Sequence, residues 1–112
     1  MCTENILNTI TSNVAQEAKN LLGDKLDAVI LYGSYSRGDY DDESDIDIMV
    51  RIFCPIEALE DYSYYFNKLS SRLSLENDIT VSILLRDSET FNKYKSVLPF
   101  YTNVEKEGIK IA

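Results

Sequence analysis

The element order and the candidate chemistry both centre on residues 33–50, which read GSYSRGDYDDESDIDIMV. Within this stretch, Asp45 and Asp47 open a segment, residues 45–52, in which apolar and polar side chains alternate as in a β-strand. Residues two apart on a strand project from the same face, so both carboxylates point one way, about 7 Å apart along the backbone. Two like charges held side by side are costly without a cation between them. We therefore predict a divalent-metal platform with oxygen ligands, suited to Mg²⁺.

A second feature lies just before this pair. Gly33 and Ser34 directly follow residues 27–32, an apolar run that predicts a buried strand. A glycine at this point allows a tight turn and a close approach of a ligand to the backbone. The N–H groups that follow, with the Ser34 hydroxyl, can bind an anion such as a terminal phosphate. A metal platform beside a phosphate-binding turn is what phosphoryl or nucleotidyl transfer needs, and it requires no histidine base.

The flanking segments predict an α+β domain with a small mixed β-sheet flanked by helices. Apolar spacing and end signals predict helices over residues 3–22, 55–73, 88–98 and 99–108, with Pro55 at the first position of the second and Ser88 as the cap of the third. Strands are expected over 27–32, 45–52 and 78–85, with an edge strand at 109–111. In the third strand, Asp78, Thr80 and Ser82 share one face. The length of 112 residues fits one domain, so residues 1–112 are expected to form a single domain.

The amino-acid composition excludes several catalytic mechanisms and several classes of partner. The chain has no histidine, which excludes Ser/His/Asp and Cys/His relays and imidazole-bound zinc. Cys2 and Cys54 lie far apart, which argues against a thiolate metal site and fits a reduced compartment. Six of the 19 acids lie within residues 39–47, which contain no base, and without a basic stripe we expect no direct nucleic-acid binding. The sequence has neither an apolar run of the roughly 18 residues that a membrane span needs nor a signal peptide, so we expect no membrane association and a cytoplasmic location.

The motif in residues 33–50 resembles the signature of the DNA polymerase beta-like nucleotidyltransferase superfamily. It has Gly-Ser, ten residues, and then Asp-Ile-Asp-Ile. The string looks like that of the minimal, MNT-type members, whose usual form is GSxARGxxxxxSDIDLxV, with Ser36 in place of the usual alanine. The resemblance extends to the C-terminus through LPFY at residues 98–101 and KEGI at residues 106–109. It implies the polymerase beta-like nucleotidyltransferase fold.

The resemblance also implies roles for individual residues. The implied nucleotide-binding residues are Gly33, Ser34, Arg37 and Ser44. The implied catalytic and metal-binding residues are Asp45, Asp47 and Asp78, which would hold two Mg²⁺ ions. Asp78 is the candidate for the third carboxylate that the family carries on a later strand. Two alternatives stay open at this point, because Arg37 could simply offset the acidic loop and Asp78 could cap the start of its strand.

By this resemblance, the chain is expected to transfer a nucleoside monophosphate, AMP from ATP, to a hydroxyl of a partner protein in a Mg²⁺-dependent reaction. It has no helical domain after the sheet to select an acceptor, so a partner or a second copy in a homo-oligomer is expected to supply that surface. Minimal members of the family are often antitoxins that silence a HEPN-type RNase toxin by adenylylating a tyrosine. The alternative is a catalytically weak or inactive binding module of the same fold that neutralises its partner by complex formation alone.

Overall fold

A four-stranded mixed sheet forms the centre of the computed structural model, which describes residues 3–112, so that Cys2 lies outside the described part. The strands are β1 (Leu26–Tyr32), β2 (Ile46–Ile52), β3 (Val81–Asp87) and β4 (Ile109–Lys110), in the order β3-β2-β1-β4. β1 runs antiparallel to both β2 and β4, whereas β2 and β3 are parallel. This mixed pairing confirms the predicted α+β class.

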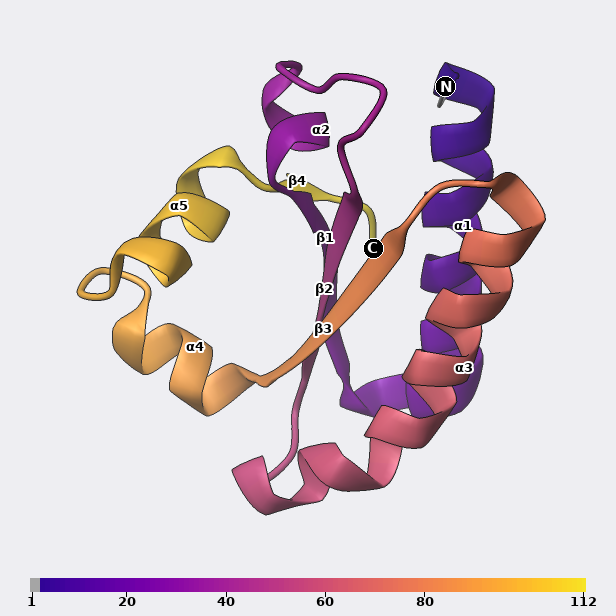
Figure 1. Ribbon diagram of the computed structural model, residues 1–112. Coiled ribbons are helices and arrows are strands. Elements are labelled where there is room, and N and C mark those ends of the chain that lie inside the picture. The colour runs from indigo at the N-terminus through magenta and orange to yellow at the C-terminus, as the bar shows by residue number, and fades with distance from the viewer. Residues whose placement is uncertain (1–2) are drawn as a thin grey trace.

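Helices cover both faces of this sheet. They are α1 (Glu4–Leu22), α2 (Ser34–Arg37), α3 (Leu59–Asn77), α4 (Ser88–Tyr94) and α5 (Pro99–Glu107), with 3-10 turns at Gly23–Lys25 and Ile56–Ala58. Figure 1 shows α1 and α3 on one face of the sheet, α4 and α5 on the other, and α2 at the end where β1 stops. Among residues 3–112, no helix combines the length and the apolar character that crossing a bilayer requires.

Successive side chains of β2 point to opposite faces of the sheet, and each face packs in its own hydrophobic cluster. Ile46, Ile48, Val50 and Ile52 are fully buried and pack in the cluster formed with α1 and α3. Met49 points to the other face, where it packs with Phe91 of α4 and Val104 of α5. Each fully buried side chain of this size stabilises the fold by about 1.5–3 kcal/mol. Asp47 is two residues before Met49 and so lies on the same face, toward α4 and α5, where it is only partly buried.

Helix ends account for most differences from the predicted boundaries. α1 begins after Thr3, whose side chain accepts a hydrogen bond from the Ile6 N–H at 3.1 Å, and it ends at Gly23, as predicted. α3 continues past its predicted end to Asn77 and stops at Asp78, which adopts the left-handed conformation at φ 51°. Because Asp78 terminates a helix, the predicted start of the third strand was wrong, and β3 begins three residues later.

The cap of α4 also differs from the prediction. Asp87, not Ser88, precedes the helix, and its carboxylate accepts a hydrogen bond from the Thr90 N–H at 2.9 Å. The Ser88 hydroxyl instead donates to the carboxylate of Asp27 on β1 at 2.6 Å. This contact joins the end of β3 to the start of β1, at the end of the sheet away from α2.

Candidate functional site

The turn after β1 brings the backbone of Gly33 directly against a carboxylate. Gly33 has φ 76° and ψ −157°, a region that residues with a side chain rarely adopt. A Cβ added here would lie 2.5 Å from Oδ2 of Asp47. The short helix α2 follows, and the Ser34 carbonyl closes it by accepting from the N–H groups of Gly38 and Asp39 at 3.0 and 3.2 Å. The Gly-Ser turn and the start of β2 therefore form one contiguous site.

Three polar side chains form a row across the sheet at this end. Asp47 pairs with Tyr32 of β1 in the antiparallel register and with Ser82 of β3 in the parallel register. Side chains paired in this way lie on the same face, here the face covered by α4 and α5. Asp47 is thus flanked by a phenol on one side and an aliphatic hydroxyl on the other. The sequence motif does not identify Tyr32 and Ser82 as neighbours of Asp47, because strand order and register are tertiary properties.

The electrostatics of this row depend on partial burial and on like charge. Burial, and then the neighbouring charge of Asp45, raise the pKa of Asp47, while Arg37 acts in the opposite direction. Burial and the Asp47 charge raise the pKa of Tyr32 to about 12, so its phenol is protonated at neutral pH. A divalent cation bound between Asp45 and Asp47 would relieve their repulsion. The pair thus has the donor chemistry and the unbalanced negative charge that fit Mg²⁺.

Asp78 lies apart from Asp47 but near Asp45. A hollow of about 220 Å³ opens beside the loop before β2, and its lining residues are Asp42, Glu43, Ser44, Asp45, Asp78, Ile79 and Thr80. Asp78 thus shares a hollow with Asp45, while Asp47 is not part of that lining. Within residues 3–112, no three Asp, Glu or Cys side chains come together in a group that could hold a metal ion. Asp45, which directly precedes β2, thus lies near Asp47, whose pKa its charge raises, and shares this hollow with Asp78, whereas Asp47 and Asp78 line no common hollow.

Arg37 and Ser44 are engaged in contacts within the chain. The Arg37 guanidinium lies 3.0 Å from the Asp39 carboxylate and 3.4 Å from that of Glu107 on α5. It also lines a hollow of about 190 Å³ between α2 and α5, together with Tyr32, Gly33, Phe100, Asn103, Val104 and Glu107. The Ser44 hydroxyl accepts from the Asp41 N–H at 3.0 Å and so holds the acidic loop together. Their nucleotide-binding roles remain predictions.

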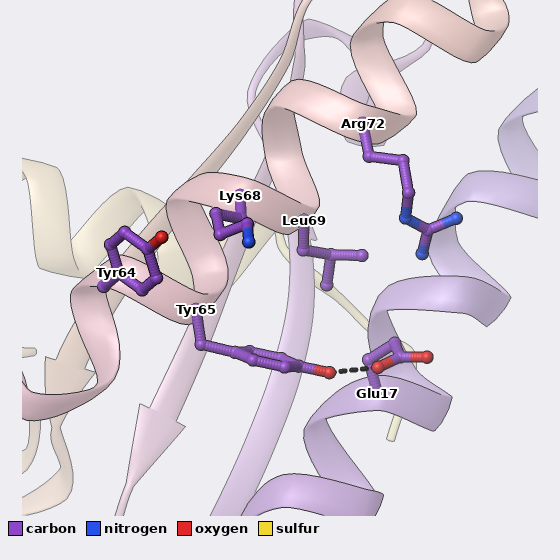
Figure 2. Close-up of a pocket in the computed structure, with 6 residues that line it drawn as sticks. All are labelled: Glu17, Tyr64, Tyr65, Lys68, Leu69 and Arg72. Atoms are coloured by element: carbon purple, nitrogen blue, oxygen red, sulfur yellow. Dashed lines mark hydrogen bonds between the residues drawn. The ribbon is translucent and has the colours of Figure 1, made fainter.

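A larger hollow, of about 470 Å³, lies on the opposite layer of the molecule (Figure 2). Its lining comes from α1 and α3: Glu17, Tyr64, Tyr65, Lys68, Leu69 and Arg72. The Tyr65 hydroxyl donates a hydrogen bond to the Glu17 carboxylate, which ties the two helices together. This hollow contains one carboxylate and lies across the sheet from Asp47, so it does not belong to the site at the Gly-Ser turn.

Comparison with known proteins shows the family to which the chain belongs. A family model described as a nucleotidyltransferase domain matches residues 12–111. This chain belongs to that family. A curated relative from Methanocaldococcus jannaschii, named "Putative protein adenylyltransferase MJ0141", is 35% identical over 104 residues, which cover 91% of this chain and 95% of the relative. A second protein of that organism with the same description, MJ0604, is 37% identical over 84 residues, covering 75% of this chain and 76% of the relative.

Solved structures share the fold of this nucleotidyltransferase. A chain of a toxin–antitoxin complex crystallised with AMP-PNP superposes with a TM-score of 0.61 at 20% identity, covering 91% of this chain and 72% of that chain. The structure of a tri-AMPylated HEPN toxin of Shewanella oneidensis with its MNT antitoxin gives a TM-score of 0.54 at 18% identity, with 95% and 71% covered. The predicted MNT-type nucleotidyltransferase fold and enzyme class are confirmed by these matches and by the family model.

Proposed function

We propose that this nucleotidyltransferase transfers AMP from ATP to a hydroxyl of a partner protein and requires Mg²⁺ for the reaction. The observation that carries this proposal is the contact between the Gly33 backbone and the Asp47 carboxylate, with Asp45 two residues away. This contact places the Gly-Ser turn, whose N–H groups can bind an anion, beside two carboxylates that can bind a cation. The choice of AMP is supported by the relatives described as protein adenylyltransferases and by the AMP-PNP in a solved complex of the same fold.

In this proposal each part of the site has a defined task. The backbone of Gly33 and Ser34 binds the triphosphate, and Arg37 and Ser44 contact it from α2 and the acidic loop. Asp45 and Asp47 hold Mg²⁺, which when bound neutralises phosphate charge and makes the α-phosphorus more electrophilic. The acceptor oxygen forms a bond to the α-phosphorus, and the bond from that phosphorus to the bridging oxygen breaks. Pyrophosphate leaves with the electron pair, and the acceptor proton passes to solvent.

The proposed acceptor is a HEPN-type toxin, which this chain would inactivate as its antitoxin. This choice is supported by the solved structures of the same fold, whose printed descriptions name toxin–antitoxin complexes and an AMPylated HEPN toxin. The competing function, a binding module that neutralises its partner without catalysis, is supported by one observation. The three predicted carboxylates do not form a common metal group within the part of the chain that the structure describes.

One experiment separates the two functions. The protein is incubated with a HEPN-type toxin, Mg²⁺ and ATP labelled at the α-phosphate, and both label on the toxin and toxin RNase activity are measured. We expect labelled, inactive toxin with the wild type, and at least tenfold less label with Asp45→Asn or Asp47→Asn, because even loss of a group that only orients a metal ligand weakens metal binding or activity by about tenfold or more. Asp24→Asn, which removes an exposed carboxylate near the start of β1, is the matched control and should label normally. Inactivation of the toxin without label would contradict the transferase and favour the binding module.

A further inference from the structure

We infer that this site binds one divalent cation per nucleotide, and that Ser82 is the residue that limits it to one. The inference rests on the proposed function, because it concerns the ions that accompany the nucleotide at Asp45 and Asp47. It replaces the expected pair of Mg²⁺ ions with a single ion. Two observations support a single ion: the register of β2 and β3, and the side chains that lie on each side of Asp47.

The parallel register identifies the nearest neighbour of Asp47 on β3. Asp47 and Ser82 are Cα partners, and adjacent strands lie about 4.8 Å apart. Val81, Ile83 and Leu85 belong to the core cluster with α1 and α3, whereas Leu84 packs in the cluster with α4 and α5. Ser82 alternates with Val81 and Ile83, so its side chain lies on the same face as Asp47. The position that could complete a second cation site beside Asp47 therefore carries a hydroxyl.

This hydroxyl is free to act as a ligand but brings no charge. Ser82 is only partly buried, and its side chain makes no hydrogen bond to any residue in the described part of the chain. Two Mg²⁺ ions in one site lie about 3.5–4 Å apart and repel each other, so carboxylates must bridge and surround them. Here the Tyr32 phenol and the Ser82 hydroxyl flank Asp47 on β1 and β3. Beyond the ion that accompanies the triphosphate at Asp45 and Asp47, a second ion would find only these two neutral hydroxyls and no third carboxylate beside Asp47.

Asp78 does not replace the missing carboxylate. The Thr80 carbonyl accepts the Ile46 N–H at 2.9 Å, so Thr80 lies level with the start of β2. Asp78 is two residues before Thr80 in the chain. It is itself the residue in left-handed conformation that ends α3. Its side chain opens into the acidic hollow that Asp45 lines and Asp47 does not. The turn that ends α3 thus holds the Asp78 carboxylate beside the acidic hollow, away from the row formed by Tyr32, Asp47 and Ser82.

Counting ions tests the inference without measuring turnover. Equilibrium dialysis with saturating Mn²⁺ and α,β-methylene-ATP, which cannot release pyrophosphate, gives the number of ions per bound nucleotide. We expect one ion for the wild type, one for Ser82→Ala, one for Asp78→Asn, and two for Ser82→Asp. Asn is the control substitution at residue 78 because it tolerates the left-handed conformation while removing the charge.

The possible failures are distinguishable. Two ions per nucleotide in the wild type would overturn the inference and leave the proposed function intact, and a lower count in Asp78→Asn would identify Asp78 as the ligand that was missed. Ser82→Asp remaining at one ion would also contradict the role given to residue 82. No nucleotide binding by the wild type would overturn the proposed function and the inference together. If Ser82→Asp does not fold, the wild-type count and its insensitivity to Asp78→Asn still decide the question.

Discussion

Replacing Gly33 with alanine tests the contact on which the site is built. The backbone at φ 76° and ψ −157° costs a residue with a side chain about 1–3 kcal/mol. The new Cβ would also lie 2.5 Å from Asp47 Oδ2, and relieving such overpacking costs a further 1–3 kcal/mol, roughly. We expect Gly33→Ala to lower the free energy of unfolding by about 2–6 kcal/mol. Displacement of the carboxylate should also abolish the rise in melting temperature caused by Mg²⁺ with α,β-methylene-ATP.

Gly38→Ala is the matched control for this substitution. Gly38 ends α2 with φ 80°, and an added Cβ would meet nothing within 4 Å. Only backbone strain remains, so we expect a loss of about 1–2 kcal/mol and an unchanged response to nucleotide. Urea denaturation supplies both free energies. Equal losses for the two variants, with the nucleotide response intact in both, would refute the reasoning.

A double substitution isolates the collision itself. In an Asp47→Ala background the carboxylate is gone, and the Cβ of residue 47 lies 3.5 Å from the added methyl group, an ordinary contact. The cost of Gly33→Ala should then fall to the backbone strain of about 1–3 kcal/mol. An unchanged cost in this background would show that the carboxylate is not what excludes a side chain at residue 33.

Three further predictions concern single side chains. Because the pKa of Asp47 is raised above its ordinary value of 3.8, the folded state holds this proton more tightly, and the stability from it is lost as the pH rises through the folded value. Without divalent ions, Asp47→Asn should therefore be more stable than the wild type at pH 7, because burial and then the Asp45 charge disfavour the ionised carboxylate. The gain, on the order of 0.5–1 kcal/mol, should vanish in acid when measured by urea denaturation. Tyr65→Phe removes the hydrogen bond to Glu17 and should cost about 0.5–1.5 kcal/mol, whereas Tyr64→Phe, at a ring that is 74% exposed, should change little; equal thermal shifts would contradict the contact. Asp78→Gly should raise the free energy of unfolding by about 1 kcal/mol because glycine adopts the left-handed conformation without strain, and a loss of stability would argue against this account of the helix end.

Local patterns were sufficient for most of the fold. The alternation in residues 45–52 predicted β2 because one face of that strand is buried and the other is not. Helix boundaries were reliable where a side chain or a glycine marks the end, as at Thr3 and Gly23. They failed at Asp78 and Ser88, where the choice between helix cap and strand depends on contacts with distant residues. Ser88 donates to Asp27, which is 61 residues away in the chain.

The same distinction, between features set by neighbouring residues and features set by distant contacts, applies to the candidate site. The motif in residues 33–50 was enough to predict the nucleotidyltransferase family and the turn at Gly33 that lies against Asp47, because these residues are close in sequence and their spacing sets their geometry. Which side chains flank Asp47 depends on the pairing of three strands, and that register is set by the burial of apolar faces over the whole sheet. Tertiary structure therefore decided that Tyr32 and Ser82 stand beside Asp47 while Asp78 remains at the end of a helix.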